Sequence, residues 1–212
     1  GNGVTLTSNV EEFSAYNLTI DNHNIGIQAD AATNAQVTLH SVSLLNNFRG
    51  YTSDQMSGLQ RFTQVTVTGQ GAAGVEAISG SEIRVSESTI QSNGGIGVHT
   101  QFSEVTDVRN SMITGNGGTG VSSSASESVR VIDSTLESNL FGMQAPSVSG
   151  DLLIDSTSLS DNTVHGIVAA DYTGSNALIT DSAIEDNNNY GIDVENANGG
   201  IRVIESSLTG NG

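Results

Sequence analysis

The residues of this chain whose types and spacing favour proton-transfer chemistry are Glu76 and His99, which lie 23 positions apart. A carboxylate beside an imidazole raises the pKa of the imidazole, and the two groups can then act as an acid–base pair. Arg49, Tyr51 and Asp54 precede Glu76 by about one such interval. A guanidinium neutralises charge and a phenol can donate a proton, so we predict a catalytic cluster of Glu76, His99 and Tyr51. The alternative is an ordinary polar pair on a solvated sheet.

A second group with potential for ligand binding is aromatic. Phe141, His165 and Tyr190 each come directly before a glycine, at intervals of 24 and 25 residues. Three rings placed one above another could form a platform for sugar rings, and Asp193 adds a polar group beside Tyr190. We therefore predict ligand binding by these four residues. The alternative is a stack that only seals a corner of the fold.

Both groups belong to a repeated phrase, which is written eight times with a ninth, incomplete copy at the end. Its core is an aliphatic residue, an Asn three positions later and then a Gly, as in Ile90, Asn93 and Gly97. From Gly26 to Gly212 the sequence advances 186 residues over eight steps, or 23.25 residues per step. A fixed period in this range indicates a solenoid, in which each unit contacts only its neighbours.

The segments between the turn residues are short and alternate apolar with polar side chains, as at 129–132 and 201–204. This period of two and the β-branched residues predict strands, which would pair in parallel from coil to coil at roughly 4.8 Å. We predict an all-β fold, a single-stranded parallel β-helix of about nine coils with about 23 residues per coil. It would occupy residues 1–212 as one domain, with 1–12 as an irregular or partial first coil.

Polar columns are expected to stabilise the turns between these strands. An Asn at the same place in each coil can bond to the Asn above and below and tolerate a left-handed backbone. A Ser or Thr two positions before each aliphatic residue can hold a bend through local bonds to the backbone. The predicted Asn ladder comprises Asn47, Asn93, Asn116, Asn139, Asn162, Asn187 and Asn211.

The charge balance is strongly acidic, with 23 Asp and Glu against six Arg and no Lys, for a net charge of −17. Nucleic-acid binding through a basic face is therefore excluded from our expectations, and polyanionic glycans would be repelled at long range. No run of residues is apolar enough for membrane insertion. The absence of Cys excludes disulfides and thiol chemistry.

The repeated phrase resembles that of the right-handed parallel β-helix family, which reads Ile-x-x-Asn-x-x-x-Gly-Ile. The clearest matches are 90–98 and 184–192, and the resemblance covers about residues 13–212. It implies a right-handed coil, in agreement with the chirality of parallel crossovers. The family includes pectate lyases, polygalacturonases, alginate lyases and epimerases, phage tailspikes and non-catalytic surface proteins.

The segment 190–195 also resembles the Tyr-Gly-x-Asp-Pro-His signature of alginate epimerase and lyase modules. Tyr190, Gly191 and Asp193 match, whereas Val194 replaces the Pro and Glu195 replaces the His that the resemblance makes catalytic. The mismatch at Glu195 therefore affects the residue that the activity requires.

Metal and cofactor binding have no sequence signature here. Carboxylates are plentiful enough to attract Ca²⁺, but neither the calcium-binding nonapeptide nor an EF-hand spacing occurs. The histidines fall in different columns or distant coils, so we predict no transition-metal site and no cofactor.

Two functions remain open. The first is a non-catalytic domain of a secreted or cell-surface protein, of bacterial or archaeal origin, with a structural, adhesive or filament-forming role and with polysaccharide as a candidate partner. Open coil ends are strand edges, so we expect end-to-end self-association, or contact with further coils of a longer parent protein. The alternative is a polysaccharide lyase or C5-epimerase-like enzyme, which needs a charge neutraliser, a base and an acid on one face.

Overall fold

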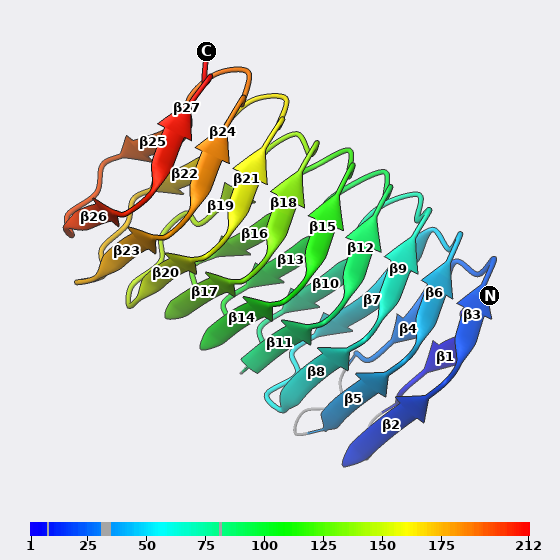
Figure 1. Cartoon of the computed structure of the whole chain (residues 1–212). Helices are drawn as coiled ribbons and strands as arrows, with labels where there is room; N and C mark the ends of the chain where they lie inside the picture. The colour runs from blue at the N-terminus through cyan, green and yellow to red at the C-terminus, as the bar shows by residue number, and fades with distance from the viewer. Residues whose placement is uncertain (8, 31–34, 81) are drawn as a thin grey trace.

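The computed structural model describes residues 1–7, 9–30, 35–80 and 82–212, and it forms a solenoid of three parallel sheets (Figure 1). Each sheet has nine strands, and each coil contributes one strand to each sheet in turn. The predicted all-β fold with about nine coils is confirmed. The described residues contain no helix, and therefore no helix that is long and apolar enough to cross a membrane.

The three sheets are named here in the order in which each coil meets them. Sheet A contains β1 (Val4–Thr5), β4 (Ile25–Gln28), β7 (Arg49–Asp54), β10 (Val75–Ile78), β13 (Val98–Gln101), β16 (Val121–Ser124), β19 (Met143–Gln144), β22 (Ile167–Ala170) and β25 (Ile192–Glu195). Sheet B contains β2 (Glu12–Tyr16), β5 (Gln36–His40), β8 (Leu59–Thr63), β11 (Glu82–Ser86), β14 (Val105–Arg109), β17 (Ser128–Ile132), β20 (Leu152–Asp155), β23 (Ala177–Thr180) and β26 (Ile201–Ile204). Sheet C contains β3 (Thr19–Asp21), β6 (Ser43–Leu45), β9 (Thr66–Thr68), β12 (Thr89–Gln91), β15 (Met112–Thr114), β18 (Thr135–Glu137), β21 (Ser158–Ser160), β24 (Ala183–Glu185) and β27 (Ser207–Thr209).

Aliphatic columns form the core between the three sheets. Ile90, Ile113 and Leu136 occupy one register position in sheet C and are at most 1% exposed. Burying such a side chain stabilises the fold by about 1.5–3 kcal/mol, and the column repeats that gain in each coil. Because like residues lie directly over like residues, the sequence period sets the core.

The Asn ladder exists as predicted. The Asn116 side-chain amide donates to Asn139 Oδ1 at 2.9 Å, and that of Asn162 donates to Asn187 Oδ1 at 2.9 Å. Each ladder amide also donates to a backbone carbonyl one coil earlier, as Asn139 Nδ2 does to Ile113 O at 3.0 Å. Buried turn groups are thereby satisfied, as a dry interior requires.

The left-handed backbone that we expected at the ladder Asn lies one residue earlier. Ser92, Ser138 and Asp161 have φ of 54°, 56° and 54°, and each directly precedes a ladder Asn. The chain reverses at this exposed residue, which leaves the Asn side chain free to point inward. The predicted position of the turn was therefore wrong by one residue.

The Ser and Thr column behaves as predicted. Ser88 Oγ donates to Ser86 O at 2.7 Å, and Ser182 Oγ donates to Thr180 O at 2.7 Å. The Gly column is explained by close approach: a Cβ on Gly97 would lie 2.7 Å from Gly120 O. That distance is too short for any larger residue.

The last coil leaves its inward side chains exposed. Val194, Val203 and Leu208 are 42%, 44% and 45% exposed, whereas their register partners one coil earlier, Ala169, Ile179 and Ile184, are at most 1% exposed. This end of the described chain therefore presents apolar groups and strand edges together.

Candidate functional site

The outer row of sheet A runs along the solenoid in the predicted register. Glu76 of β10 pairs with Thr52 of β7 on one side and with His99 of β13 on the other. The whole row consists of Gln28, Thr52, Glu76, His99, Ser122, Gln144, Val168 and Asp193. Most members have no acid–base function, and Glu76 and His99 are the two ionisable members that are direct neighbours in this row.

Glu76 lies between Arg49 and His99. Arg49 Nη1 lies 3.0 Å from Glu76 Oε2, and His99 Nδ1 lies 3.6 Å from Glu76 Oε1. Contact with His99 and the positive charge of Arg49 lower the pKa of Glu76, against the raising effect of partial burial. Glu76 is thus held as a carboxylate, and its basicity is reduced because both neighbours stabilise the charged form.

Tyr51 does not join this pair. Its side chain is fully buried, its hydroxyl donates to Gln60 Oε1 at 2.9 Å, and its ring packs edge-on against Phe62 at 4.9 Å. Burial raises the pKa of Tyr51 well above its usual value. The expected cluster of three is therefore corrected to an outward pair with Arg49, because Tyr51 occupies an inward position of β7.

A shallow hollow of about 250 Å³ lies beside the pair. Arg49 and Glu76 line it together with Asp54 and Asp30, and it is open along the surface of sheet A. A sugar carboxylate in this hollow would meet one guanidinium but also three carboxylates. That balance opposes binding of an anionic substrate, because like charges repel at short range.

The aromatic column is formed as predicted, but its geometry limits what it can bind. The ring centroids of Phe141 and His165 lie 5.7 Å apart, and those of His165 and Tyr190 lie 5.2 Å apart at an interplanar angle of 11°. The Tyr190 backbone amide also donates to His165 Nδ1 at 3.1 Å. His165 is 9% exposed and Tyr190 is 54% exposed. Near-parallel stacking covers the ring faces, so Tyr190 provides the accessible aromatic surface.

Asp193 lies next to this column. Its Oδ2 is 3.8 Å from His165 Nε2, and its side chain is about a quarter exposed. Tyr190 and Asp193 therefore form a small polar and aromatic patch at the last coil. Glu195, where the resemblance calls for His, occupies an exposed position of β25.

Within the part of the chain that the structure describes, no group of three or more His, Cys, Asp or Glu side chains is placed to hold a metal ion. The expectation of no metal remains a prediction, because this search covers geometry and not binding.

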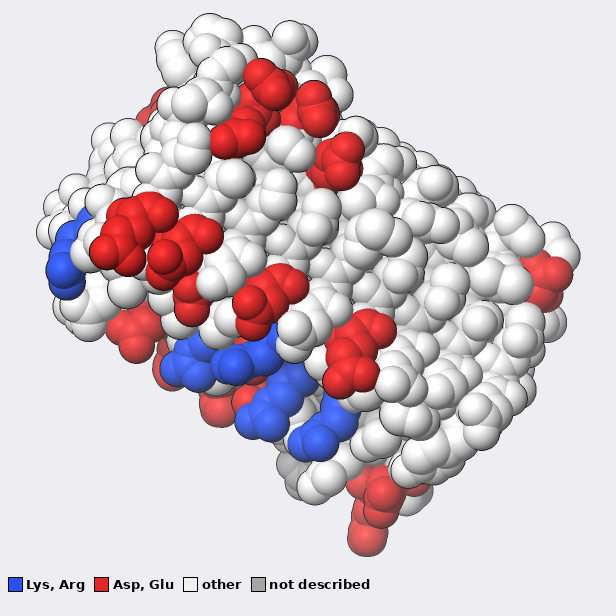
Figure 2. Space-filling model, viewed as in Figure 1, with Lys and Arg blue, Asp and Glu red and all other residues white. Residues whose placement is uncertain are grey.

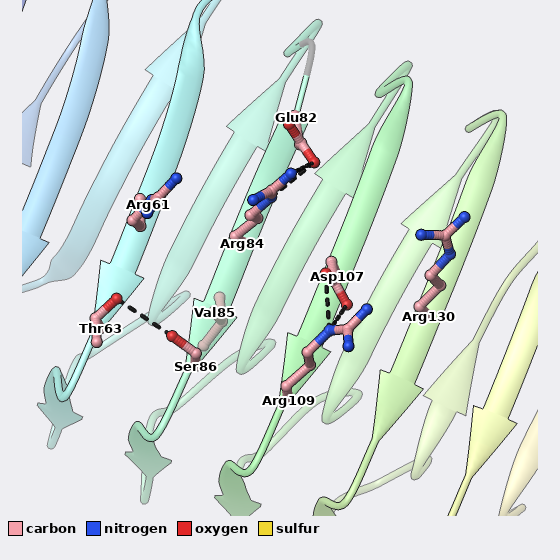
Figure 3. Close-up of a pocket in the computed structure, with 9 residues that line it drawn as sticks. All are labelled: Arg61, Thr63, Glu82, Arg84, Val85, Ser86, Asp107, Arg109 and Arg130. Carbon is pink, nitrogen blue, oxygen red and sulfur yellow. Dashed lines mark hydrogen bonds and ion pairs between the residues drawn. The ribbon is translucent and has the colours of Figure 1, made fainter.

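A cluster of arginines was not predicted from the sequence. Four of the six Arg line a groove on sheet B, together with Glu82 and Asp107 (Figure 3). The signal was readable, since Arg61 and Arg84 lie 23 residues apart and Arg130 follows after a further 46, or two periods. The net charge of the whole chain conceals the positive charge of this one face.

Comparison with known proteins agrees with this architecture. The profile of the family described as "Right handed beta helix region" matches residues 2–150 and 51–208. The two matches together span nearly the whole sequence, and the chain belongs to this right-handed β-helix family. No curated protein matches the sequence.

Two solved structures are similar. The A-module of the Azotobacter vinelandii mannuronan C-5 epimerase AlgE4 aligns over 98% of this chain and 77% of its own, with a TM-score of 0.55 and 12% identity. The A-module of AlgE6 from the same organism aligns over 100% of this chain and 77% of its own, with a TM-score of 0.44 and 13% identity. At such identities the likeness to AlgE4 establishes a shared fold.

Proposed function

We propose that this chain is a non-catalytic domain of a secreted or cell-surface protein, with a structural or adhesive role, and that it binds polysaccharide on its sides. The observation that carries this proposal is the burial of Tyr51. An epimerase or lyase needs a neutraliser, a base and an acid in contact with one sugar. Here the phenol lies in the core, and the remaining carboxylate is already neutralised by Arg49.

The surface supports the same proposal. The outer row of sheet A is mostly uncharged, and Glu195 stands where the alginate epimerase and lyase signature has its catalytic His. A net charge of −17 favours solubility of an elongated body. Tyr190, with its exposed ring beside Asp193, provides a patch on which a sugar could stack and donate a hydrogen bond.

The second candidate is a polysaccharide lyase or C5-epimerase-like enzyme. The observation in its favour is that Arg49, Glu76 and His99 are grouped on one outer face, beside a hollow. The AlgE4 module, which shares the fold, is a mannuronan C-5 epimerase. In this candidate His99 would be the base and Arg49 the neutraliser.

Turnover assays separate the two candidates. The protein is incubated with alginate and with pectin, while absorbance follows the 4,5-unsaturated product and NMR follows inversion at C5. We expect no turnover of either polymer. Turnover that is abolished by His99→Ala, and retained by Gln144→Ala in the same row, would establish the enzyme and overturn the proposal.

Binding is tested separately on a glycan array. We expect Tyr190→Ala to weaken binding of the retained glycans at least several-fold, because the substitution removes the accessible ring. Phe102→Ala is the matched control, since Phe102 is 58% exposed but lies apart from the aromatic column. Equal binding by both variants would contradict the role of Tyr190. Fractionation of the native cells tests the proposed location.

A further inference from the structure

The six Arg are the only Lys or Arg residues of the sequence, and four of them gather on one face. Figure 2 shows the arginines as a strip bordered by carboxylates. Arg61 of β8, Arg84 of β11 and Arg130 of β17 share one register column of sheet B, with Asp107 of β14 between the last two. Arg109 lies two positions further along β14. The chain therefore concentrates its scarce positive charge.

The groove formed by these residues has a volume of about 340 Å³, and its cations are only partly neutralised (Figure 3). Arg84 Nη2 lies 2.6 Å from Glu82 Oε1. Arg109 Nε donates to both oxygens of Asp107, at 2.8 and 3.0 Å. Among the described residues, Arg61 and Arg130 have no ion-pair partner.

The electrostatics of the groove favour an additional anion. Four guanidiniums and two carboxylates leave a charge of 4 − 2 = +2, on a chain whose net charge is −17. Arg61 and Arg84 are directly opposite in register, and like charges in that arrangement destabilise a sheet. An anion that bridges the column would relieve this repulsion and add charge-assisted hydrogen bonds.

The spacing of the two unpaired cations indicates the length of the ligand. Arg61 and Arg130 are three coils apart, or about 14 Å at the spacing of parallel strands. A single phosphate or carboxylate cannot contact both. The ligand must be extended along the solenoid and must carry at least two anionic groups.

The walls of the groove indicate a sugar. The hydroxyls of Thr63 and Ser86 lie 3.2 Å apart beside the arginines and can exchange hydrogen bonds with a polyol. An adjoining hollow of about 310 Å³ shares Arg109 and Arg130; besides Asp151 and Asn176, its lining includes half-buried aliphatic side chains. These are Ile132, Leu153 and Leu178, which could cover the C–H face of a sugar ring.

We propose that this groove binds an acidic polysaccharide, a linear glycan with carboxylates on successive sugars, along the axis of sheet B. Each unpaired guanidinium would hold one carboxylate in a bidentate fork. A net charge of +2 does not favour nucleic acid, because affinity for its backbone comes from neutralising many phosphates. This proposal rests on the proposed polysaccharide-binding role, but it concerns another face than Tyr190, so each can fail alone.

The test measures affinity for a fluorescently labelled oligogalacturonate of seven sugars by anisotropy in 150 mM salt. At this ionic strength the distant carboxylates are screened over about 8 Å, while contacts within the groove persist. We expect the double variant Arg61→Gln/Arg130→Gln to weaken binding at least tenfold. Arg202→Gln is the matched control, because Arg202 lies in the same column beyond Leu153 and Leu178, and it should bind like the parent.

Two further measurements keep the proposal falsifiable. Without ligand, the double variant should be at least as stable as the parent, since Arg61 and Arg84 then repel less; a loss of stability would indicate a structural role and would overturn the proposal. Phe102→Ala, which removes an exposed ring outside both proposed binding surfaces, should leave binding of this probe unchanged. The proposal would be overturned if the probe did not bind, or if its binding were lost only in Tyr190→Ala. It would also be overturned if a carboxyl-reduced sugar, polyglutamate or a DNA oligonucleotide bound with equal affinity.

Discussion

The Asn ladder allows a worked prediction for Asn139→Ala. Asn139 is fully buried, and its Oδ1 accepts the backbone amide of Asn116 at 3.1 Å and the Asn116 side chain at 2.9 Å. Its own amide donates to Ile113 O at 3.0 Å and to Asn162 Oδ1 at 3.4 Å. Alanine removes all four contacts.

The loss of stability depends on which of these hydrogen-bonding groups are left without a partner in the variant. The Asn116 side chain retains its bond to Ile90 O, at 3.3 Å, and Asn162 Oδ1 retains the backbone amide of residue 139, at 3.1 Å. The Asn116 backbone N–H loses its acceptor in a dry interior, which costs about 1–3 kcal/mol. With the other bonds and the small void, we expect a total loss of about 3 kcal/mol.

Urea unfolding followed by circular dichroism measures this loss. With an m-value of about 3 kcal/mol/M for a chain of this size, the midpoint should fall by about 1 M. The matched control is Asn189→Ala, an exposed Asn outside the ladder, which should change stability by less than about 0.5 kcal/mol. Asn211→Ala, at the half-buried end of the ladder, should fall between the two because water can replace its bonds.

An Asn139→Ala midpoint equal to that of Asn189→Ala would refute the reasoning. The ladder would then be a consequence of the coil geometry and not a source of its stability. A change of m-value without a change of midpoint would instead point to loss of cooperativity between coils.

Three further predictions concern titration, burial and association. Because the pKa of Glu76 is lowered in the folded chain, its contribution is present above the unfolded pKa of about 4.3 and is lost as pH falls through the lower folded value. The urea midpoint of Glu76→Gln should therefore lie below that of the parent at pH 6 and approach it at pH 3; a constant difference would contradict this. Tyr51→Phe should cost about 1–2 kcal/mol in urea unfolding, because Gln60 Oε1 loses a buried donor, and any turnover of polysaccharide should be unaffected. In sedimentation velocity the 212-residue chain should associate with rising concentration and Leu208→Glu should stay monomeric, since Leu208 is 45% exposed at the open coil; a strict monomer for the parent would exclude this contact.

Much of the architecture was readable in the order of residues. In a solenoid, a residue such as Ile113 pairs within its sheet with positions about one period away, so the sequence period already gives these neighbours. The same arithmetic correctly placed Glu76 beside His99 and His165 beside Tyr190. Alternation of apolar and polar residues assigned most inward and outward positions, because successive side chains of a strand face opposite sides.

Other features depended on how side chains and backbone fit in three dimensions. A tyrosine hydroxyl can donate a proton, but Tyr51 points inward. It is a core residue because its ring packs against Phe62 and its hydroxyl donates to Gln60. The turn residue shifted from the ladder Asn to the residue before it, because the amide must point inward to reach the next coil.

The distribution of charge shows most clearly the difference between what the sequence predicts and what the tertiary structure decides. A total of −17 describes the field far from the molecule, whereas recognition at contact depends on charges within a few ångströms. The superposition of coils brings Arg61, Arg84 and Arg130 from 70 residues of sequence, 61–130, into one column. The one-dimensional pattern contains the repeat, but side-chain pairing decides which of these cations are neutralised and which remain available to a ligand.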